Sequence, residues 1–306
     1  MDKPTSPPAP RQLDIFADSR DVMLRNDLLH ALARREGAAG RHALAQLAEG
    51  YPADALLAPA ELLLSALVAP DEATLALTGA ASLAAARLHL RAAIVPAAIA
   101  VLGMDDGRAW LAPLWRDLAQ RHAHLPWNGA QPDDHAAPLW LAAGEWTQAA
   151  QSAGSIASWR RLPAPLAWMT EARCRLEGID GVWPLLAELA WLAPKRLDAL
   201  LRVLADPLLD RLRRRFEDSF DAGVDPRDEH CALAWFLAWV LTDTPALAPR
   251  LAQAEPGQDS NPERGLRLLV QMLGLERQGR HHELVARRKA LRDLCAPLYA
   301  AYKATR

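Results

Sequence analysis

The sequence predicts an all-α fold built from stacked antiparallel helix pairs, and three observations support this fold class. Ala and Leu, which are strong helix formers, account for about 60 and about 50 of the 306 residues, while Val, Ile, Tyr and Phe are scarce. No segment alternates apolar and polar residues with the two-residue period of a strand. Gly and Pro instead separate apolar segments of helical spacing, and a hydrophobic content of 51% is enough for a sizeable core.

The N-terminal third is expected to consist of helices separated by short breaks. Residues 1–11 contain four prolines and no apolar periodicity, which predicts a disordered tail. The first helix is expected to start near Asp18–Asp21, with Asp18 or Ser19 as its N-cap, and to end at Gly37. Further helices are expected up to Gly50, from Pro59 to Leu67, and over the Ala-rich residues 72–102 with a break at Pro96.

The remainder of the chain continues with helices and short loops. Residues 103–107 are expected to form a turn, after which Asp105 or Asp106 caps a helix that extends through Leu118. Proline and glycine residues make 125–134 the best candidate for an internal joint, and loops are expected at 221–229 and 254–262. Because none of these loops is long enough for an inter-domain linker, residues 12–306 are predicted to form a single helical domain with its candidate joint near 125–134.

A glycine turn between two apolar helices recurs along the chain. It occurs around Gly144, Gly178 and Gly279, and the segment that ends at Gly37 follows the same pattern. Gly144 and Gly178 are 34 residues apart, and 101 residues separate Gly178 from Gly279. A helix–turn–helix period of 34 residues is the signature of tetratricopeptide repeats. In this respect the chain resembles the tetratricopeptide-like α-solenoids, and the resemblance implies a right-handed stack of antiparallel helix pairs. Segment lengths near the usual 10–14 residues, joined by short loops, predict about 13–16 helices.

The tryptophans are confined to one part of the chain. All 11 lie between Trp110 and Trp239. Helical spacing places Trp183 with Trp191, and Trp235 with Trp239, on common helix faces. Such faces usually pack into a core, but a solenoid can also expose Trp in a groove that binds a partner segment. The candidate groove residues are Trp140, Trp146, Trp183, Trp191, Trp235 and Trp239.

A short linear motif follows the proline-rich tail. It consists of Gln12, Leu13, Asp14, Ile15 and Phe16. This pentapeptide resembles the motif by which bacterial replication and repair proteins dock on the sliding clamp, although Ile15 stands where Leu is usual. The resemblance implies that Gln12 hydrogen-bonds in one subsite while the apolar side chains fill pockets. The alternative is a hydrophobic staple, in which Ile15 and Phe16 fold back on Val22 and Met23 to fix the first helix.

Signatures of catalytic and metal sites are missing from the sequence. There is no Walker-type phosphate loop, no GxGxxG or GxSxG motif and no HExxH motif. The histidine groups at 122/124, 133–135 and 281–283 could meet in space, but nothing in their spacing requires a metal site. The acidic pairs at 105/106 and 133/134 are expected to be helix caps. We therefore expect no cofactor, no metal and no enzymatic activity.

Charge and cysteine content bear on partners and compartment. A formal net charge of −2 disfavours a nucleic-acid partner or an anionic membrane. Residues 261–306 nevertheless carry ten basic and four acidic side chains, and we expect this charged segment to form a solvated helix face. The dispersed cysteines Cys174, Cys231 and Cys295 predict buried thiols in a reducing compartment. The longest apolar stretch, near residues 80–102, is interrupted by charged residues, so we expect a cytoplasmic protein without a membrane partner.

These observations favour a non-enzymatic cytoplasmic scaffold that binds a segment of another protein in a Trp-rich groove. Two other classes remain open: a replication- or repair-associated protein that docks on the sliding clamp through Gln12–Phe16, and a helical enzyme whose site is assembled from distant residues.

Overall fold

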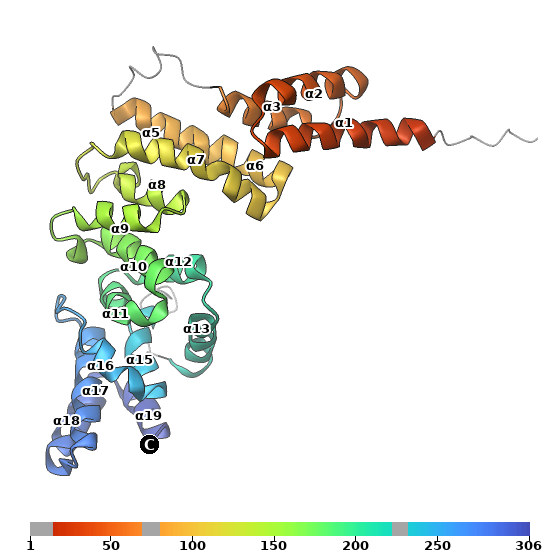
Figure 1. Ribbon diagram of the computed structural model, residues 1–306. Coiled ribbons are helices and arrows are strands. Elements are labelled where there is room, and N and C mark those ends of the chain that lie inside the picture. Colours follow the sequence, from red (N-terminus) through yellow and green to blue (C-terminus); the bar gives the residue numbers. More distant parts are fainter. Residues whose placement is uncertain (1–14, 69–79, 222–231) are drawn as a thin grey trace, which may run out of the picture. The chain divides into compact units, whose positions relative to one another are not determined.

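The computed structural model describes residues 15–68, 80–221 and 232–306. The expected tail over residues 1–11, nearly all of the loop expected over 221–229, and Cys231 lie outside these ranges. Within the described ranges the chain is helical and contains no strand, which confirms the predicted all-α class (Figure 1). The chain divides into two compact units, residues 1–122 and 123–306, and each unit is described by itself below.

Unit 1 is a set of helices in which neighbours along the chain pack on one another. Helix α1 packs on α2, α2 on α3, and α6 on α7. Its core contains the fully buried side chains of Leu28, Leu32, Leu47 and Leu63. The helices are α1 (Ile15–Ala33), α2 (Gly37–Gly50), α3 (Leu57–Ala66), α5 (Ala80–His89), α6 (Val95–Leu102) and α7 (Met104–His122).

Three predicted boundaries in unit 1 are wrong. Helix α1 begins at Ile15, so Asp18 and Ser19 lie within the helix and do not cap it. The chain is not broken at Pro96, because a π-helical turn over Leu90–Ile94 joins α5 to α6 and the proline falls in the first turn of α6, where its missing N–H is tolerated. The turn expected over 103–107 is Gly103 alone, and α7 already contains Asp105 and Asp106 in its first turn.

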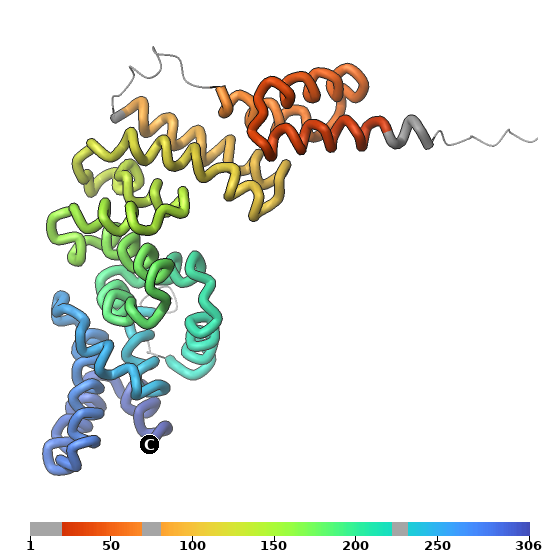
Figure 2. Tube along the Cα trace, in the orientation of Figure 1, coloured from red at the N-terminus to blue at the C-terminus, as the bar shows by residue number. Residues whose placement is uncertain are grey.

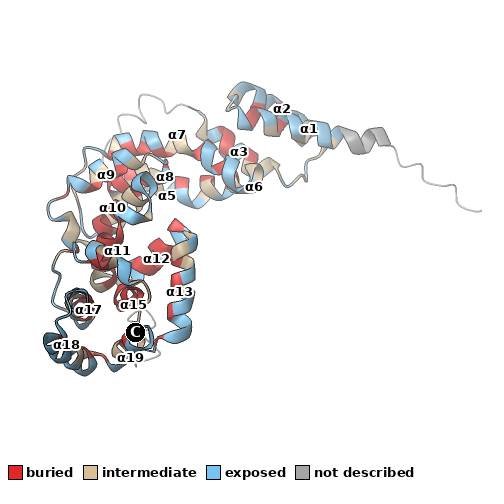
Figure 3. Ribbon diagram, turned by 60° about the horizontal axis from the view of Figure 1, so that its bottom comes forward, coloured by how far each residue is buried: buried red, intermediate tan, exposed pale blue. Residues whose placement is uncertain are grey.

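Unit 2 contains the larger core, which is built around one helix that is buried on every side. Residues Val182–Ala190, covering most of α11, are all buried, and neighbouring helices surround them (Figure 3). A helix that is apolar all round is typical of the centre of a domain. The helices are α8 (Ala136–Ala142), α9 (Trp146–Gly154), α10 (Pro163–Glu177), α11 (Trp183–Leu192), α12 (Pro194–Leu204), α13 (Pro207–Ser219), α15 (Phe236–Asp243), α16 (Ala248–Leu251), α17 (Asn261–Arg277), α18 (His281–Leu294) and α19 (Ala296–Ala304).

Three helix pairs, α1–α2, α8–α9 and α17–α18, are joined by the same tight turn. Figure 2 shows the path of the chain, coloured by residue number. At Gly144 the turn residue donates its N–H to the carbonyl oxygen of Leu141, and the next N–H, of Glu145, reaches back to Trp140. The same pair of hydrogen bonds is repeated at Gly279 and at Arg35, and all three turn residues have positive φ. This is the Schellman arrangement, which satisfies the last carbonyl groups of a helix and starts the next helix at once.

The fourth turn of the predicted pattern has a different geometry, and one turn residue differs from the prediction. Gly178 has φ 80° and ψ 178°, and its N–H bonds back only to Cys174. The 34-residue spacing from Gly144 to Gly178 therefore connects two turns of different type. Near the N-terminus the left-handed residue is Arg35 and not Gly37, which instead begins α2.

Contacts with Trp110 explain why an arginine occupies a left-handed position. The guanidinium of Arg35 lies 4.6 Å from the centre of the Trp110 ring and donates to the Trp110 carbonyl oxygen. The Trp110 indole N–H in turn donates to the carbonyl oxygen of Leu32 at 2.8 Å, in the last turn of α1. These contacts attach the α1–α2 turn to α7 and offset the cost of positive φ at a residue with a side chain.

One helical run meets the length and hydropathy criteria of a membrane span. The run covers Ala81–Leu102 and is long and apolar enough to cross a membrane, and 22% of its most apolar part is buried. Core helices of soluble proteins and signal sequences meet the same criteria, so this finding is weak support for a span.

Gly178 provides a test of the turn geometry. An added Cβ would meet no neighbouring atom there, so the cost of Gly178→Ala comes from the backbone conformation alone. That conformation is essentially restricted to glycine, and we expect the free energy of unfolding to fall by about 1–3 kcal/mol. The matched control is Gly274→Ala, which also adds a methyl group in open space but lies within α17, and which should stabilise by about 0.5–1 kcal/mol. Equal effects in urea unfolding would contradict the assignment.

Candidate functional site

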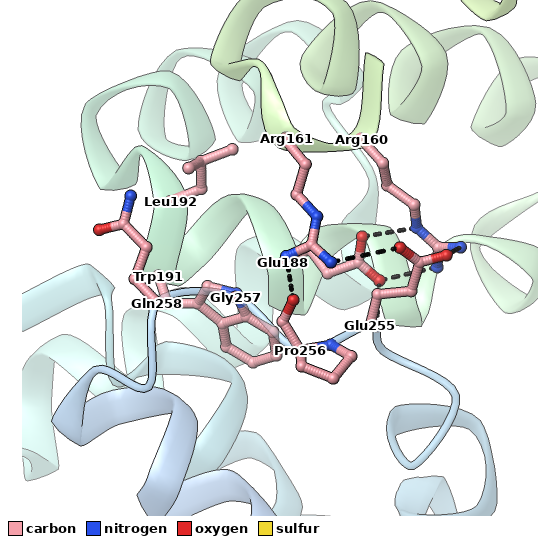
Figure 4. Close-up of a pocket in the computed structure, with 9 residues that line it drawn as sticks. All are labelled: Arg160, Arg161, Glu188, Trp191, Leu192, Glu255, Pro256, Gly257 and Gln258. Atoms are coloured by element: carbon pink, nitrogen blue, oxygen red, sulfur yellow. Dashed lines mark hydrogen bonds and ion pairs between the residues drawn. The ribbon is translucent and has the colours of Figure 1, made fainter. Parts of the chain in front are cut away.

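A small hollow in unit 2 lies where helix α11 meets the loop between α16 and α17. Arg160 and Arg161 approach it from the 3₁₀ turn before α10, and Glu188, Trp191 and Leu192 come from α11 (Figure 4). The loop residues 255–258 close the remaining side. The free volume is about 80 Å³, which is room for a few water molecules but not for a drug-sized ligand or a large cofactor.

Glu188 is the central charge of this site. Its side chain is 4% exposed, although it belongs to the apolar helix α11. The Arg160 guanidinium binds this carboxylate in a bidentate manner: Nε donates to Oε2 and Nη2 donates to Oε1, each at 2.7 Å. The backbone N–H of Glu255 also donates to Oε1 at 2.7 Å. A buried carboxylate of this kind is tolerated because it accepts three hydrogen bonds, two of them from a cation.

Burial and pairing act in opposite directions on the two charges. Burial raises the pKa of the Glu188 carboxyl above its ordinary value, and the Arg160 guanidinium reduces this rise. Burial alone would lower the pKa of Arg160, because it disfavours the charged guanidinium. The hydrogen bonds and charges of Glu188 and Glu255 outweigh this effect and raise the pKa of Arg160 overall. Arg160 therefore stays charged, and it ties α11 to the loop by binding both carboxylates at once.

A second buried glutamate holds the other half of the loop. Glu263, in the first turn of α17, accepts the backbone N–H of Gly257 at 2.8 Å through Oε1 and that of Asp259 at 3.0 Å through Oε2. Arg267 pairs with the same carboxylate at 3.0 Å, and its guanidinium lies 5.9 Å from the centre of the Trp191 ring. A Cβ on Gly257 would come within 2.6 Å of the Trp191 indole nitrogen, so the loop is pressed closely against this ring.

The buried charges at and next to the hollow are paired with one another. Glu188 accepts three N–H hydrogen bonds, and Glu263 behind the loop accepts four. Arg160 and Arg267 are engaged by these carboxylates. A general acid or base has to exchange its proton with a substrate, and a carboxylate surrounded by such donors is poorly suited to that role. The arrangement is suited to holding a rigid surface loop.

The six groove candidates do not gather on one surface. Trp183 and Trp235 are buried in the core, where Trp183 is 1% exposed. Trp140 and Trp146 are half-buried against the same core. Trp191 lines the hollow described above, and Trp239 lines a separate groove. Sequence spacing identified Trp183 with Trp191 as one face, yet only the second of them reaches a surface hollow.

The groove at Trp239 is formed by helices α13, α15 and α19. Its free volume is about 520 Å³, and Trp239 forms part of its floor with only 5% of its surface exposed. The alanines of α19 present a smooth wall, and the other side carries a bidentate ion pair between Arg215 and Asp243, in which Arg215 Nη1 lies 3.0 Å from Asp243 Oδ2. The Arg215 guanidinium lies 6.0 Å from the centre of the Trp239 ring.

The predicted caps and the metal prediction can be compared with the structure. Asp133 and Asp134 lie in a 3₁₀ turn, and the residue that caps α8 is His135, whose Nδ1 accepts the N–H of Ala137 at 3.2 Å. The His135 ring also stacks on Trp168, with the ring centres 5.7 Å apart. Within the described ranges no group of three His, Cys, Asp or Glu side chains could hold a metal ion.

The clamp-like motif falls largely outside the described residues. Gln12, Leu13 and Asp14 precede them, and Ile15 and Phe16 begin helix α1 with side chains that are not described. The two residues of the alternative staple, Val22 and Met23, are 48% and 64% exposed. The clamp interpretation and the staple therefore both stay predictions.

The charged residues of the hollow were not predicted from the sequence, although Trp191 was named there as a groove candidate. Arg160 is 28 residues from Glu188 and 95 from Glu255, so no local spacing links them. One signal was available, because Glu188 is the only charged residue in the segment Trp183–Leu192. A lone acid in an apolar helix needs a partner when it is buried, and this could have marked Glu188 as part of a polar network.

Comparisons with known proteins do not add a family. No protein-family model matches the chain, and no match is found among curated proteins or solved structures.

The Glu263 network predicts a specific dependence of stability on pH. Burial alone would raise the pKa of Glu263, but the N–H of Gly257, the Arg267 guanidinium and the N–H of Asp259 together lower it below the ordinary 4.5. The folded state thus binds fewer protons than the unfolded state near this pH, so the stabilisation is present above pH 4.5 and is lost as the pH falls through the folded-state value.

We expect Glu263→Gln to lower the free energy of unfolding by about 1–3 kcal/mol at pH 7, with the gap to wild type closing below pH 4.5. Urea unfolding followed by Trp fluorescence across this range measures the gap. The control is Glu283→Gln, the same change at an exposed residue of α18, which should have little effect at any pH. A gap of the same size at acid and neutral pH would contradict the role given to Glu263.

Proposed function

We propose that this protein is a non-enzymatic cytoplasmic scaffold that binds a segment of a partner protein. The observation that carries the proposal is the groove between α13, α15 and α19, with about 520 Å³ of free volume and Trp239 on its floor. That volume is in the usual range for ligand sites, and a buried aromatic floor beside a paired charge is the composition of interface hot spots.

A tetratricopeptide-like solenoid is the architecture that we propose for the scaffold. Short Schellman turns at Arg35, Gly144 and Gly279 join consecutive helices into hairpins, and the hairpin is the unit that such solenoids stack. In the α17–α18 hairpin, for example, the two helices pack on each other. Stacked hairpins leave grooves between helices of successive units, which is where we place the partner segment.

A cytoplasmic location is part of the proposal. Cys295, which is buried, and Cys174, which is half-buried, are free thiols in the structure. Burial raises the pKa of both thiols, so they are kept in the less reactive neutral form. Inert buried thiols are usual in proteins of a reducing compartment.

Two other functions are weaker proposals. An enzyme would need a site with a free acid, base or nucleophile, whereas the charges of the Arg160–Glu188 hollow are engaged with one another. Docking on a sliding clamp through Gln12–Phe16 is compatible with the scaffold, since a linear motif next to a helix start would act separately from the groove at Trp239.

Substitution within the groove tests the scaffold. Ala300→Arg places a long charged side chain on the groove wall, and Ala199→Arg makes the same change on the exposed side of α12. We expect a protein captured from native cell extract to bind the purified wild type and the Ala199→Arg variant alike in calorimetry. The Ala300→Arg variant should bind it about tenfold more weakly or worse, because the groove is obstructed.

Two results would contradict the groove as the binding site. One is equal affinity of the captured protein for all three chains. The other is the absence of any captured protein that binds the purified wild type. Circular dichroism with an unchanged melting temperature shows that each variant is folded before binding is compared.

A further inference from the structure

We propose that a second surface of unit 2, the groove between helices α17 and α18, binds an acidic amphipathic segment of a partner protein. This surface is separate from the Trp239 groove, which lies between α13, α15 and α19 and shares no lining residue with it. Binding at this second surface can therefore be tested separately from binding at the Trp239 groove.

The groove combines an apolar interior with a cationic edge. Its free volume is about 290 Å³. The residues of each helix follow one another at intervals of three or four, so each set forms a continuous stripe along its helix. Such a stripe suits a ligand that lies along the hairpin. The lining includes Arg264, Arg267 and Leu268 from α17, and Arg287, Ala290 and Leu294 from α18.

The charge of the groove is not balanced from within. No acidic side chain lines it among the described residues. Arg287 has no hydrogen-bond or ion-pair partner in the described part of the chain. Arg264 approaches the mostly exposed Asp259 only to 4.0 Å, and Arg267 is held by Glu263. Two of the three arginines are thus available for an incoming carboxylate, to which arginine binds in a bidentate manner.

The acidic residues of the surrounding helices are already occupied. Residues 261–306 carry ten basic and four acidic side chains. The excess positive charge of this part of the chain therefore remains uncompensated by its own acids, and an acidic partner would be attracted to it. Glu263 pairs with Arg267, Glu276 with Arg288 and Arg306, Glu283 with Arg280, and Asp293 lies 3.7 Å from Arg292.

The interior of the groove favours a protein segment over a nucleic acid. Proteins that bind single-stranded nucleic acid combine cations with aromatic rings on which the bases stack. This groove has no aromatic lining residue in the part that the structure describes, and its uncharged lining residues are Leu268, Gln271, Ala290 and Leu294. A lining of mostly aliphatic side chains next to arginines fits an amphipathic helix whose apolar side chains enter the groove while its acids meet the arginines.

Selection from a displayed library of random peptides tests the proposal, because such a library samples acidic, basic and apolar segments alike. The full-length chain is used as the target, together with two charge reversals on the same helix. Arg287→Glu alters the groove, and Lys289→Glu makes an equal charge change at an exposed residue outside it. Binding of individual selected peptides is then measured by fluorescence anisotropy at low and high salt.

We expect peptides selected on the wild type to be rich in Asp and Glu and to carry apolar residues at helical spacing. Their affinity should fall about tenfold or more with Arg287→Glu, change little with Lys289→Glu, and weaken as salt rises. The proposal is overturned if the selected peptides lack an excess of acids, or if both reversals have the same effect.

Two further measurements identify other occupants, and either would overturn the proposal. Tighter binding of single-stranded RNA or DNA oligonucleotides, abolished by Arg287→Glu, would make the groove a nucleic-acid surface. A dimer in analytical ultracentrifugation that dissociates with Arg287→Glu but not with Lys289→Glu would make a second copy of the chain the occupant.

Discussion

Glu188 carries a negative charge within a helix that is otherwise apolar and buried, and the arrangement of unit 2 around this charge follows from the need to satisfy it. Helix α11 can lie at the centre of the core only if the carboxylate finds donors there. Arg160 and the backbone of Glu255 supply them, and they come from segments far apart in sequence. Once these bonds form, the start of α10, helix α11 and the loop before α17 are fixed together.

The same loop is secured from its other end by Glu263, so two buried carboxylates hold one short segment of backbone. Gly257 is itself held by Glu263 through its N–H, and its closeness to Trp191 leaves no room for a side chain. A loop held in this way is a firm support for the start of α17, and Arg267 on that helix belongs both to the loop network and to the cationic groove. The polar network and the binding surface that we propose on α17 and α18 are thus physically connected.

Local chemistry was predictable from the sequence, whereas long-range pairing was not. The all-helical class and the turns at Gly144 and Gly279 follow from helix propensity and from the freedom of glycine at positive φ. Gly37 was the wrong turn residue because Trp110, far along the chain, makes Arg35 acceptable at a left-handed position. Trp191 was identified by spacing, but Arg160 and Glu255 join it only through tertiary contacts that no periodicity encodes.

Hydrogen exchange of the loop amides tests most directly whether the two buried carboxylates, Glu188 and Glu263, hold the loop, because each of them accepts hydrogen bonds from particular backbone N–H groups. Glu255 donates to Glu188, and Gly257 and Asp259 donate to Glu263, whereas the N–H of Gln258 has no acceptor in the described part of the chain. The account predicts that the first three amides exchange about a hundredfold or more slowly than that of Gln258. Equal, rapid exchange at all four residues would contradict it.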